Sequence, residues 1–120
     1  MSEKTILIVD DDESMKKIFQ KMISNNFKAN IVLAKNGEEA IKIIRNKTPD
    51  LVITDHDMPI MNGSTLINII REEKISSKII LITGFLFGVK KDILESVDLS
   101  LKKPVGMKEL LNSVENILYV

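Results

Sequence analysis

The chain has 120 residues, with 17 basic and 17 acidic side chains, one histidine and no cysteine, so its formal net charge is zero. This length suits a single domain, and the lack of cysteine excludes disulfides, thiolate zinc sites and cysteine catalysis. Nucleic-acid binding is disfavoured, because there is no basic excess and only Arg45 and Arg71 are arginines. No apolar run approaches the roughly 20 residues of a membrane span. We therefore expect a cytoplasmic protein with neither a membrane nor a nucleic acid as partner.

Short, unbroken apolar runs alternate with segments of helical periodicity along the chain. Unbroken runs are typical of strands in a parallel sheet that is covered on both faces. The predicted strands are 6–9, 31–34, 51–53, 79–82 and 99–102, of which the second and the fifth are the weaker.

Apolar residues spaced three and four apart predict an amphipathic helix after each strand, with the apolar stripe packed in the core. The stripes are Met15, Ile18, Phe19, Met22 and Ile23; Ala40, Ile41, Ile43 and Ile44; Leu66, Ile67, Ile69 and Ile70, within about 63–73; Val89, Ile93 and Val97; and Leu110, Leu111, Val114, Ile117 and Leu118. The alternation predicts an α/β fold, namely a flavodoxin-like doubly wound parallel sheet of order 2-1-3-4-5 with five flanking helices. Because the last helix runs almost to Val120, we expect one domain over 1–120 with no output domain in this chain.

In this topology, reactive residues are expected directly after the strands, around the crevice between strands 1 and 3. Four acids at 10–13 follow the first strand, Thr-Asp-His-Asp at 54–57 ends the third, Thr83 ends the fourth, and Lys-Lys-Pro at 102–104 ends the fifth. Clustered carboxylates raise one another's pKa values, and a divalent cation relieves this repulsion. Oxygen ligands favour Mg²⁺, or Mn²⁺, over zinc. A carboxylate nucleophile, a hydroxyl, an ammonium and Mg²⁺ together suit phosphoryl transfer through an aspartyl phosphate.

Several of these residues also have a purely structural interpretation. Asp12 and Glu13 are better explained as N-cap or first-turn acids of the following helix. His56 is better explained as a histidine that is hydrogen-bonded by its neighbours or exposed. Asp10 and Asp11 are not needed for a cap, so they are the stronger candidates for a site.

Four segments together resemble the receiver domain of two-component response regulators. They are Ile-Val-Asp-Asp-Asp at 8–12, Asp-His-Asp-Met-Pro-Ile-Met-Asn-Gly at 55–63, Ile-Thr-Gly at 82–84 and Lys-Pro at 103–104, in the family's order. The resemblance implies that Asp55 accepts a phosphoryl group from a sensor histidine kinase or a histidine phosphotransfer protein. It also implies a Mg²⁺ site made by Asp11 directly, Asp10 through water, Asp55, and the backbone carbonyl of Asp57.

The same resemblance implies that Thr83 binds a phosphoryl oxygen and that Lys103, which proline follows directly, pairs with the phosphate. Lys102 is then expected on the opposite side of its strand. A receiver domain is a regulatory phosphoacceptor, not an enzyme, and catalyses only its own phosphorylation and slow dephosphorylation. Phosphorylation would change the binding of a downstream protein on the face near strands 4 and 5, in a monomer or weak dimer.

The sequence departs from the family's pattern in the residues that relay the signal. Ser100 stands where a switch aromatic is common, Ser96-Val97 where Gly-Ala is frequent, and Val105 where Phe is common. Phe85 and Phe87 are candidates for an alternative apolar surface, or for packing within their loop. Asp57 and Phe85 lie two positions after Asp55 and Thr83, where receivers modulate the access of the hydrolytic water. The sequence leaves open whether Asp57 lengthens or shortens the lifetime of the phosphate.

Two other functional classes compete with this interpretation. A phosphatase of the haloacid dehalogenase type would use Asp55-x-Asp57, but Met58 replaces that motif's Thr or Val, and Asp10 and Asp11 would be unexplained. A pseudo-receiver would bind its partner without phosphorylation; the missing aromatic favours it, and the complete acidic site opposes it.

Overall fold

The computed structural model describes residues 3–119, in which five strands alternate with five α-helices. The strands are β1 (Lys4–Val9), β2 (Ala29–Ala34), β3 (Leu51–Asp55), β4 (Lys78–Thr83) and β5 (Leu99–Lys102). The helices are α1 (Glu13–Asn26), α2 (Gly37–Asn46), α3 (Gly63–Glu72), α4 (Lys91–Ser96) and α5 (Met107–Leu118), and a short 3-10 helix, η1 (Leu86–Gly88), precedes α4. No helix within 3–119 has the length and apolar character needed to cross a membrane.

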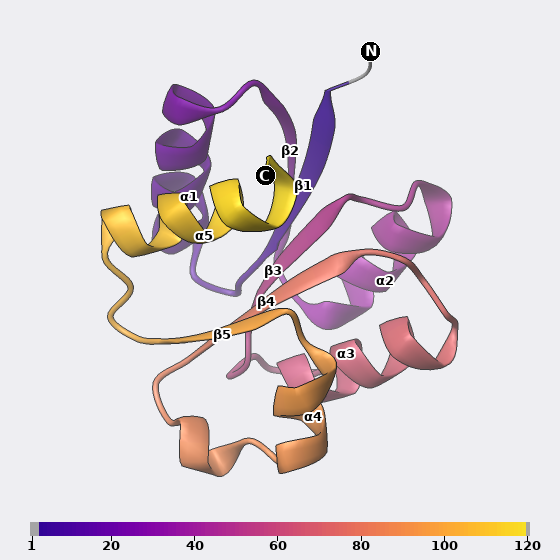
Figure 1. Cartoon of the computed structure of the whole chain (residues 1–120). Helices are drawn as coiled ribbons and strands as arrows, with labels where there is room; N and C mark the ends of the chain where they lie inside the picture. The colour runs from indigo at the N-terminus through magenta and orange to yellow at the C-terminus, as the bar shows by residue number, and fades with distance from the viewer. Residues whose placement is uncertain (1–2, 120) are drawn as a thin grey trace.

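The five strands form one parallel sheet in the order β2-β1-β3-β4-β5 (Figure 1), which confirms the predicted doubly wound fold. Val9 pairs with Thr54, and Asp55 pairs with Ile82, so β1, β3 and β4 end at nearly the same level. We call this end of the sheet the carboxyl edge and the opposite end the amino edge. The residues that follow the strands are therefore brought to one side of the molecule.

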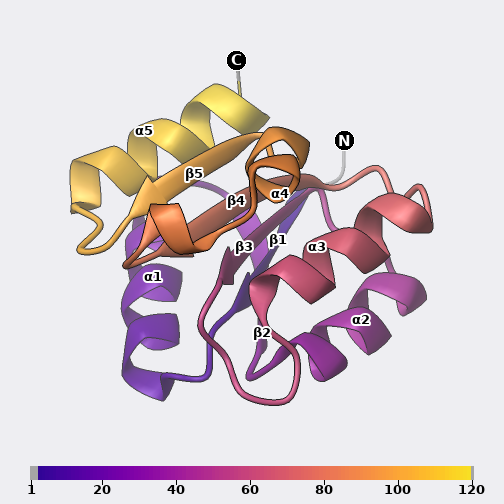
Figure 2. The same cartoon turned by 90° about the horizontal axis from the view of Figure 1, so that it is seen from below.

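Helices cover both faces of the sheet, with α1 and α5 on one face and α2, α3 and α4 on the other (Figure 2). Alternate residues of each strand enter opposite cores. In β1, Ile6 and Ile8 pack toward α1 and α5, whereas Leu7 and Val9 pack toward α2 and α3. Burial on both faces explains why these strands are unbroken apolar runs in the sequence.

Helix α1 corrects one part of the predicted core. Ile18 was expected in the apolar stripe, but it is 45% exposed, whereas Lys16 is only 3% exposed. The helix is rotated so that Lys16, Phe19 and Ile23 face the sheet. The Lys16 side chain is buried up to its ammonium, and its Nζ lies 2.6 Å from Glu13 Oε1.

Side-chain caps begin three helices close to the carboxyl edge. Asp12 Oδ1 accepts the N–H groups of Ser14 and Met15 at 2.9 and 3.2 Å at the start of α1, which confirms the capping interpretation of Asp12. Asn36 caps α2, and Asn62 caps α3. These caps satisfy backbone donors of the first turn that have no partner within the helix.

Strand β3 runs through Asp55, two residues beyond the predicted apolar run. Thr54 and Asp55 are polar, so hydrophobicity alone does not mark them as strand. Pairing with β4 continues to Asp55 nevertheless, and the N–H of His56 still donates to the carbonyl of Ile82 at 2.9 Å. Pairing with β4 therefore extends β3 to include Asp55, and the hydrogen bonds of the sheet hold the Asp55 backbone in place.

Candidate functional site

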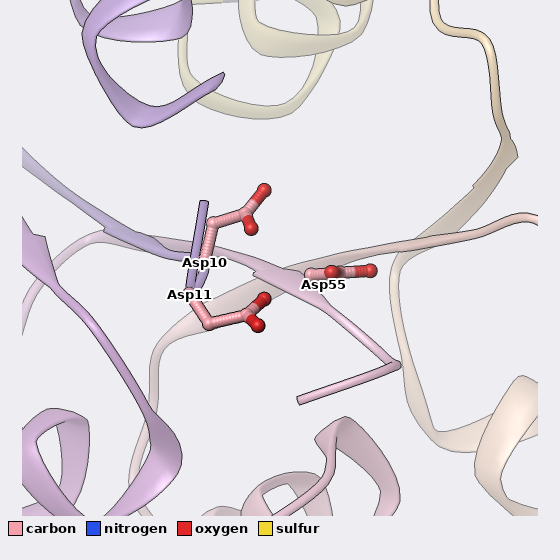
Figure 3. Close-up of side chains that lie close together, drawn as sticks. All are labelled: Asp10, Asp11 and Asp55. Carbon is pink, nitrogen blue, oxygen red and sulfur yellow. The ribbon is translucent and has the colours of Figure 1, made fainter. Parts of the chain in front are cut away.

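Three aspartates gather at the carboxyl edge, where Asp10 and Asp11 follow β1 and Asp55 ends β3 (Figure 3). One carboxylate oxygen from each lies within 4.8 Å of those of the other two. Asp10 and Asp55 are each 5% exposed, and Asp11 is exposed. The structure therefore brings together the three predicted carboxylates from two neighbouring strands.

Burial raises the pKa of the Asp10 carboxyl above its ordinary value. The N–H of Asp12, which donates to Asp10 Oδ1 at 2.9 Å, opposes this shift, but the negative charges of Asp55 and Asp11 add to it. Carboxylates at such distances repel one another when all are ionised. The site is therefore electrostatically unfavourable unless a cation joins it.

Lys103 supplies one cation at this site. Its Nζ lies 2.8 Å from Asp55 Oδ1. Partial burial lowers the pKa of the Lys103 ammonium, but the hydrogen bond and charge of Asp55, with the charges of Asp10 and Asp57, outweigh this and raise it. Lys103 is thus held in its charged form against Asp55, whereas Lys102 is exposed at the end of β5.

Thr83 ends β4 next to Asp55 and is only 1% exposed. Its Oγ1 accepts the N–H of Phe85 at 3.2 Å, and its carbonyl accepts the N–H of Lys103 at 2.9 Å. Because a hydroxyl that accepts one hydrogen bond still has its own proton to donate, Thr83 can serve as a donor to an anion at the carboxyl edge.

The loop between β3 and α3 is held close to Asp55. The N–H of Gly63 donates to the carbonyl of His56 at 2.9 Å. A Cβ at Gly63 would lie 2.8 Å from the carbonyl oxygen of Asp55 and 2.9 Å from Cα of His56, so a side chain there would collide with backbone. The glycine at 63 is thus explained by this close approach.

His56 connects the two sides of this loop. Its Nε2 lies 2.8 Å from Ser64 Oγ, and its Nδ1 lies 3.3 Å from Asp57 Oδ1. The His56 side chain is 15% exposed, and that of Asp57 is 67% exposed. The histidine is therefore hydrogen-bonded by its neighbours, as the structural interpretation predicted.

The donor set fits a hard divalent cation. Asp10, Asp11 and Asp55 offer only oxygen ligands and outnumber the single ammonium of Lys103. Mg²⁺ is usually held by one or two carboxylates together with waters and phosphate oxygens. These three residues would therefore hold such an ion.

Apolar surface borders the carboxylates on two sides. A pocket of about 510 Å³ opens beside Asp10 and Lys103. Its other lining residues are Asp12, Met15, Phe19, Ile82, Pro104 and Val105. Beyond Thr83, Phe85 and Phe87 pack edge to face and are 64% and 94% exposed.

The comparison with protein families agrees with this arrangement of fold and site. The model described as the response regulator receiver domain matches residues 6–115, which is most of the chain. The chain belongs to this family. The receiver-domain fold and the predicted resemblance are thereby confirmed.

Individual relatives place receiver domains in proteins of different length. The chain is 33% identical over 122 residues to the probable transcriptional regulator ycf29 of Pyropia yezoensis, covering 98% of this chain and 54% of the relative. It is 33% identical over 120 residues to histidine kinase P4 of Formosa agariphila, covering 97% of this chain and 9% of the kinase. The chain thus spans about half of one curated relative and under a tenth of the other.

A solved structure shows the same fold as this chain. It is the response regulator protein TrrA of Thermotoga maritima in complex with Mg(2+)-BeF, with a TM-score of 0.87 and 31% identity. The similarity covers 96% of this chain and 99% of that one.

The structure brings the predicted carboxylates and Lys103 together, but the contacts within the β3–α3 loop were not predicted. Ser64 carried no motif or charge signal, and its contact with His56 depends on how the loop folds back over eight residues. The buried Lys16 was also missed, because a lysine between apolar residues is typical of a solvated helix face.

Proposed function

We propose that this receiver domain is a phosphoacceptor switch of a two-component or phosphorelay system, with Asp55 as the phosphorylated residue. The observation that carries the proposal is the geometry of Asp55. It ends β3 at 5% exposure, with the ammonium of Lys103 at 2.8 Å and with Asp10 and Asp11 beside it. An acceptor carboxylate needs this environment, because it must be fixed in place while negative charge accumulates around it.

Each residue of the site has a distinct part in the transfer. Asp55 Oδ attacks the phosphorus of a phosphohistidine on the donor, the new O–P bond forms, and the N–P bond breaks with its electron pair returning to the imidazole. Lys103 pairs with the phosphoryl oxygens, and Thr83 donates its hydroxyl proton to one of them. Asp10, Asp11 and Asp55, with the backbone carbonyl of Asp57, would hold Mg²⁺, which neutralises phosphoryl oxygens when bound.

We propose a sensor histidine kinase or a histidine phosphotransfer protein as the phosphodonor, in the cytoplasm. Two observations support a protein donor: the family includes domains within histidine kinases, and the apolar pocket beside Asp10 and Lys103 gives a donor protein a surface next to the acceptor. The output would be a changed affinity for a downstream protein at the face near β4 and β5, where Thr83 contacts the loop that carries Phe85. Such a change requires the partner to prefer one of the two states.

The direct test is phosphorylation by acetyl phosphate with Mg²⁺, measured as the mass gain of the intact protein. We expect one phosphoryl group on the wild type and none on Asp55→Asn. Asp12→Asn is the matched control, since asparagine caps a helix as well as aspartate does, and it should be phosphorylated like the wild type. Equal phosphorylation of Asp55→Asn would contradict the proposal.

Ser100, in place of a switch aromatic, favours a second candidate, a pseudo-receiver whose binding ignores phosphorylation. The affinity of the wild-type protein for a partner, measured before and after phosphorylation, distinguishes the two candidates. A partner captured by the wild type with equal affinity before and after phosphorylation would support the pseudo-receiver.

A further inference from the structure

We propose that the outer side of β2 binds an extended, acidic segment of a partner protein, which pairs with residues 29–33 as an additional strand of the sheet. β2 contributes no residue to the carboxylate site, so this binding goes beyond the proposed function and does not depend on phosphorylation of Asp55. The outer side of β2 combines unpaired backbone groups, a hollow on each face of the strand and an excess of lysine.

β2 is the outermost strand on one side of the sheet. It pairs with β1 along its whole length, and Figure 2 shows it between α1 and α2. Among residues 3–119, no strand pairs with its other side. A strand in this position presents backbone donors and acceptors with which an extended peptide can pair.

The hydrogen bonds to β1 indicate which residues of β2 carry the free backbone groups. The carbonyl of Ala34 points toward β1, because it accepts the N–H of Asp10 at 3.1 Å. Backbone groups of successive residues in a strand point to opposite sides within the sheet. The N–H and carbonyl groups of Ala29, Ile31 and Leu33 therefore point outward, away from β1.

The outer side is closed directly after β2. The N–H of Lys35, which follows the strand, donates to Glu39 Oε1 at 3.2 Å and so has a partner within the chain. The backbone groups open to an added strand therefore lie within residues 29–33. This stretch has the length of an ordinary strand.

A hollow flanks β2 on each face of the sheet. On the α1 face, a hollow of about 360 Å³ is lined in part by Lys17, Lys21 and Ile31. On the α2 face, a hollow of about 270 Å³ is lined in part by the half-buried Val32 and Ile43. Because the side chains of a strand alternate between faces, a strand beside β2 would place them in the two hollows in turn. We expect acidic side chains on the α1 face and apolar ones on the α2 face.

The charge around β2 favours an acidic partner over a second copy of this chain. Residues 13–47, which include α1, β2 and α2, hold eight basic and three acidic side chains, although the whole chain is neutral. Within the part of the chain that the structure describes, no acidic side chain forms an ion pair with Lys17, Lys21, Lys28 or Lys47. Pairing of two copies through β2 would bring these like charges together, whereas an acidic segment would neutralise them.

A synthetic peptide with the expected alternation tests this surface. The probe is the capped, fluorescently labelled peptide Glu-Val-Glu-Val-Glu-Val-Glu, and its binding is measured by fluorescence anisotropy. We expect saturable binding to the wild type and roughly tenfold weaker binding when Lys17→Glu and Lys21→Glu are combined. Lys90→Glu with Lys91→Glu makes the same change of charge at the start of α4 and is the matched control, in which binding should be unchanged.

Two further measurements separate strand addition from attraction by charge alone. The same peptide methylated at every amide nitrogen keeps its charges but donates no backbone hydrogen bond, so it should bind on the order of tenfold more weakly. With saturating unmethylated peptide, amide hydrogen exchange of Ile31 and Leu33 should slow by roughly tenfold. The amides of Asn30 and Val32, which face β1, should be protected with and without peptide.

Equal binding of the methylated peptide, or binding without slower exchange at Ile31 and Leu33, would overturn strand addition in favour of a contact driven by charge alone. No binding of the unmethylated peptide would overturn the surface itself. Protection of Ile31 and Leu33 that rises with the concentration of the free protein would assign this side of β2 to a second copy. Absence of phosphorylation at Asp55 would refute the proposed function and leave the β2 surface intact.

Discussion

Aspartates lie at both edges of the sheet, but their surroundings differ. At the amino edge, Asp50 Oδ2 accepts the N–H of Thr5, and Asp98 Oδ2 accepts the N–H of Ile79, each at 2.8 Å. At the carboxyl edge, Asp10, Asp11 and Asp55 face one another around one lysine. The same residue type therefore completes backbone hydrogen bonding at one edge and leaves concentrated negative charge at the other.

The amino edge therefore stabilises the folded chain, whereas the carboxyl edge is less stable in a form that can bind a cation. A carboxylate that accepts an otherwise unpaired N–H stabilises the folded chain. Carboxylates that approach one another destabilise it until a cation binds between them. Neutralising an aspartate should therefore have opposite effects on stability at the two edges.

The largest effect is expected from Asp98→Ala at the amino edge. It leaves the N–H of Ile79, a residue with no solvent exposure, without its acceptor, and it removes a partner of Arg71 at 3.4 Å. We expect the free energy of unfolding, measured with urea, to fall by about 2 kcal/mol. Asp98→Asn keeps an acceptor oxygen and is the control; an equal loss in both variants would assign the effect to charge.

A smaller effect of opposite sign is expected from Asp10→Asn at the carboxyl edge. The asparagine oxygen can still accept the N–H of Asp12, while the buried charge next to Asp55 and Asp11 disappears. Without Mg²⁺, the free energy of unfolding should rise on the order of 1 kcal/mol. With Mg²⁺ the order should reverse, because binding stabilises the wild type more than the variant.

The pH dependence of this gain follows from the raised pKa of Asp10. A carboxyl whose pKa is higher in the folded state binds more protons there, so its contribution to stability is complete at low pH and is lost as the pH rises through the folded pKa. The advantage of Asp10→Asn should thus be small in acid and grow toward neutral pH. An advantage that shrinks as the pH rises would contradict the repulsion at this edge.

The carboxyl edge was also the part of the molecule most accessible from sequence. Strand order and periodicity predict that residues after neighbouring parallel strands meet, so the proximity of Asp10 and Asp55 follows from topology. Distances such as that between Lys103 Nζ and Asp55 Oδ1 do not, because they depend on side-chain conformations. The choice of Lys103 over Lys102 rested on the resemblance, through the proline that follows it.

The amino edge could not be predicted in the same way. No motif marks the polar residues at this edge, which are Asp50, Ser77 and Asp98. Their hydrogen-bond partners, Thr5, Pro49 and Ile79, are far from them in sequence.

The rotation of α1 about its axis was also not predicted, because Lys16 lies on the buried face in place of Ile18. Periodicity predicts that a helix packs, but the side chains on both surfaces decide its rotation.

The smallest effect is expected from Glu73→Gln, which removes a charge near the amino edge without uncovering a backbone donor. Glu73 is the C-cap residue that follows α3, and its Oε1 accepts the N–H of Arg45 Nε from α2 at 3.1 Å. Both side chains are exposed, at 38% and 56%, so water and salt screen the pair. We expect an unchanged urea midpoint at low and at high salt. A loss as large as that of Asp98→Ala would mean that ion pairing, rather than the acceptance of buried N–H groups, holds this edge together.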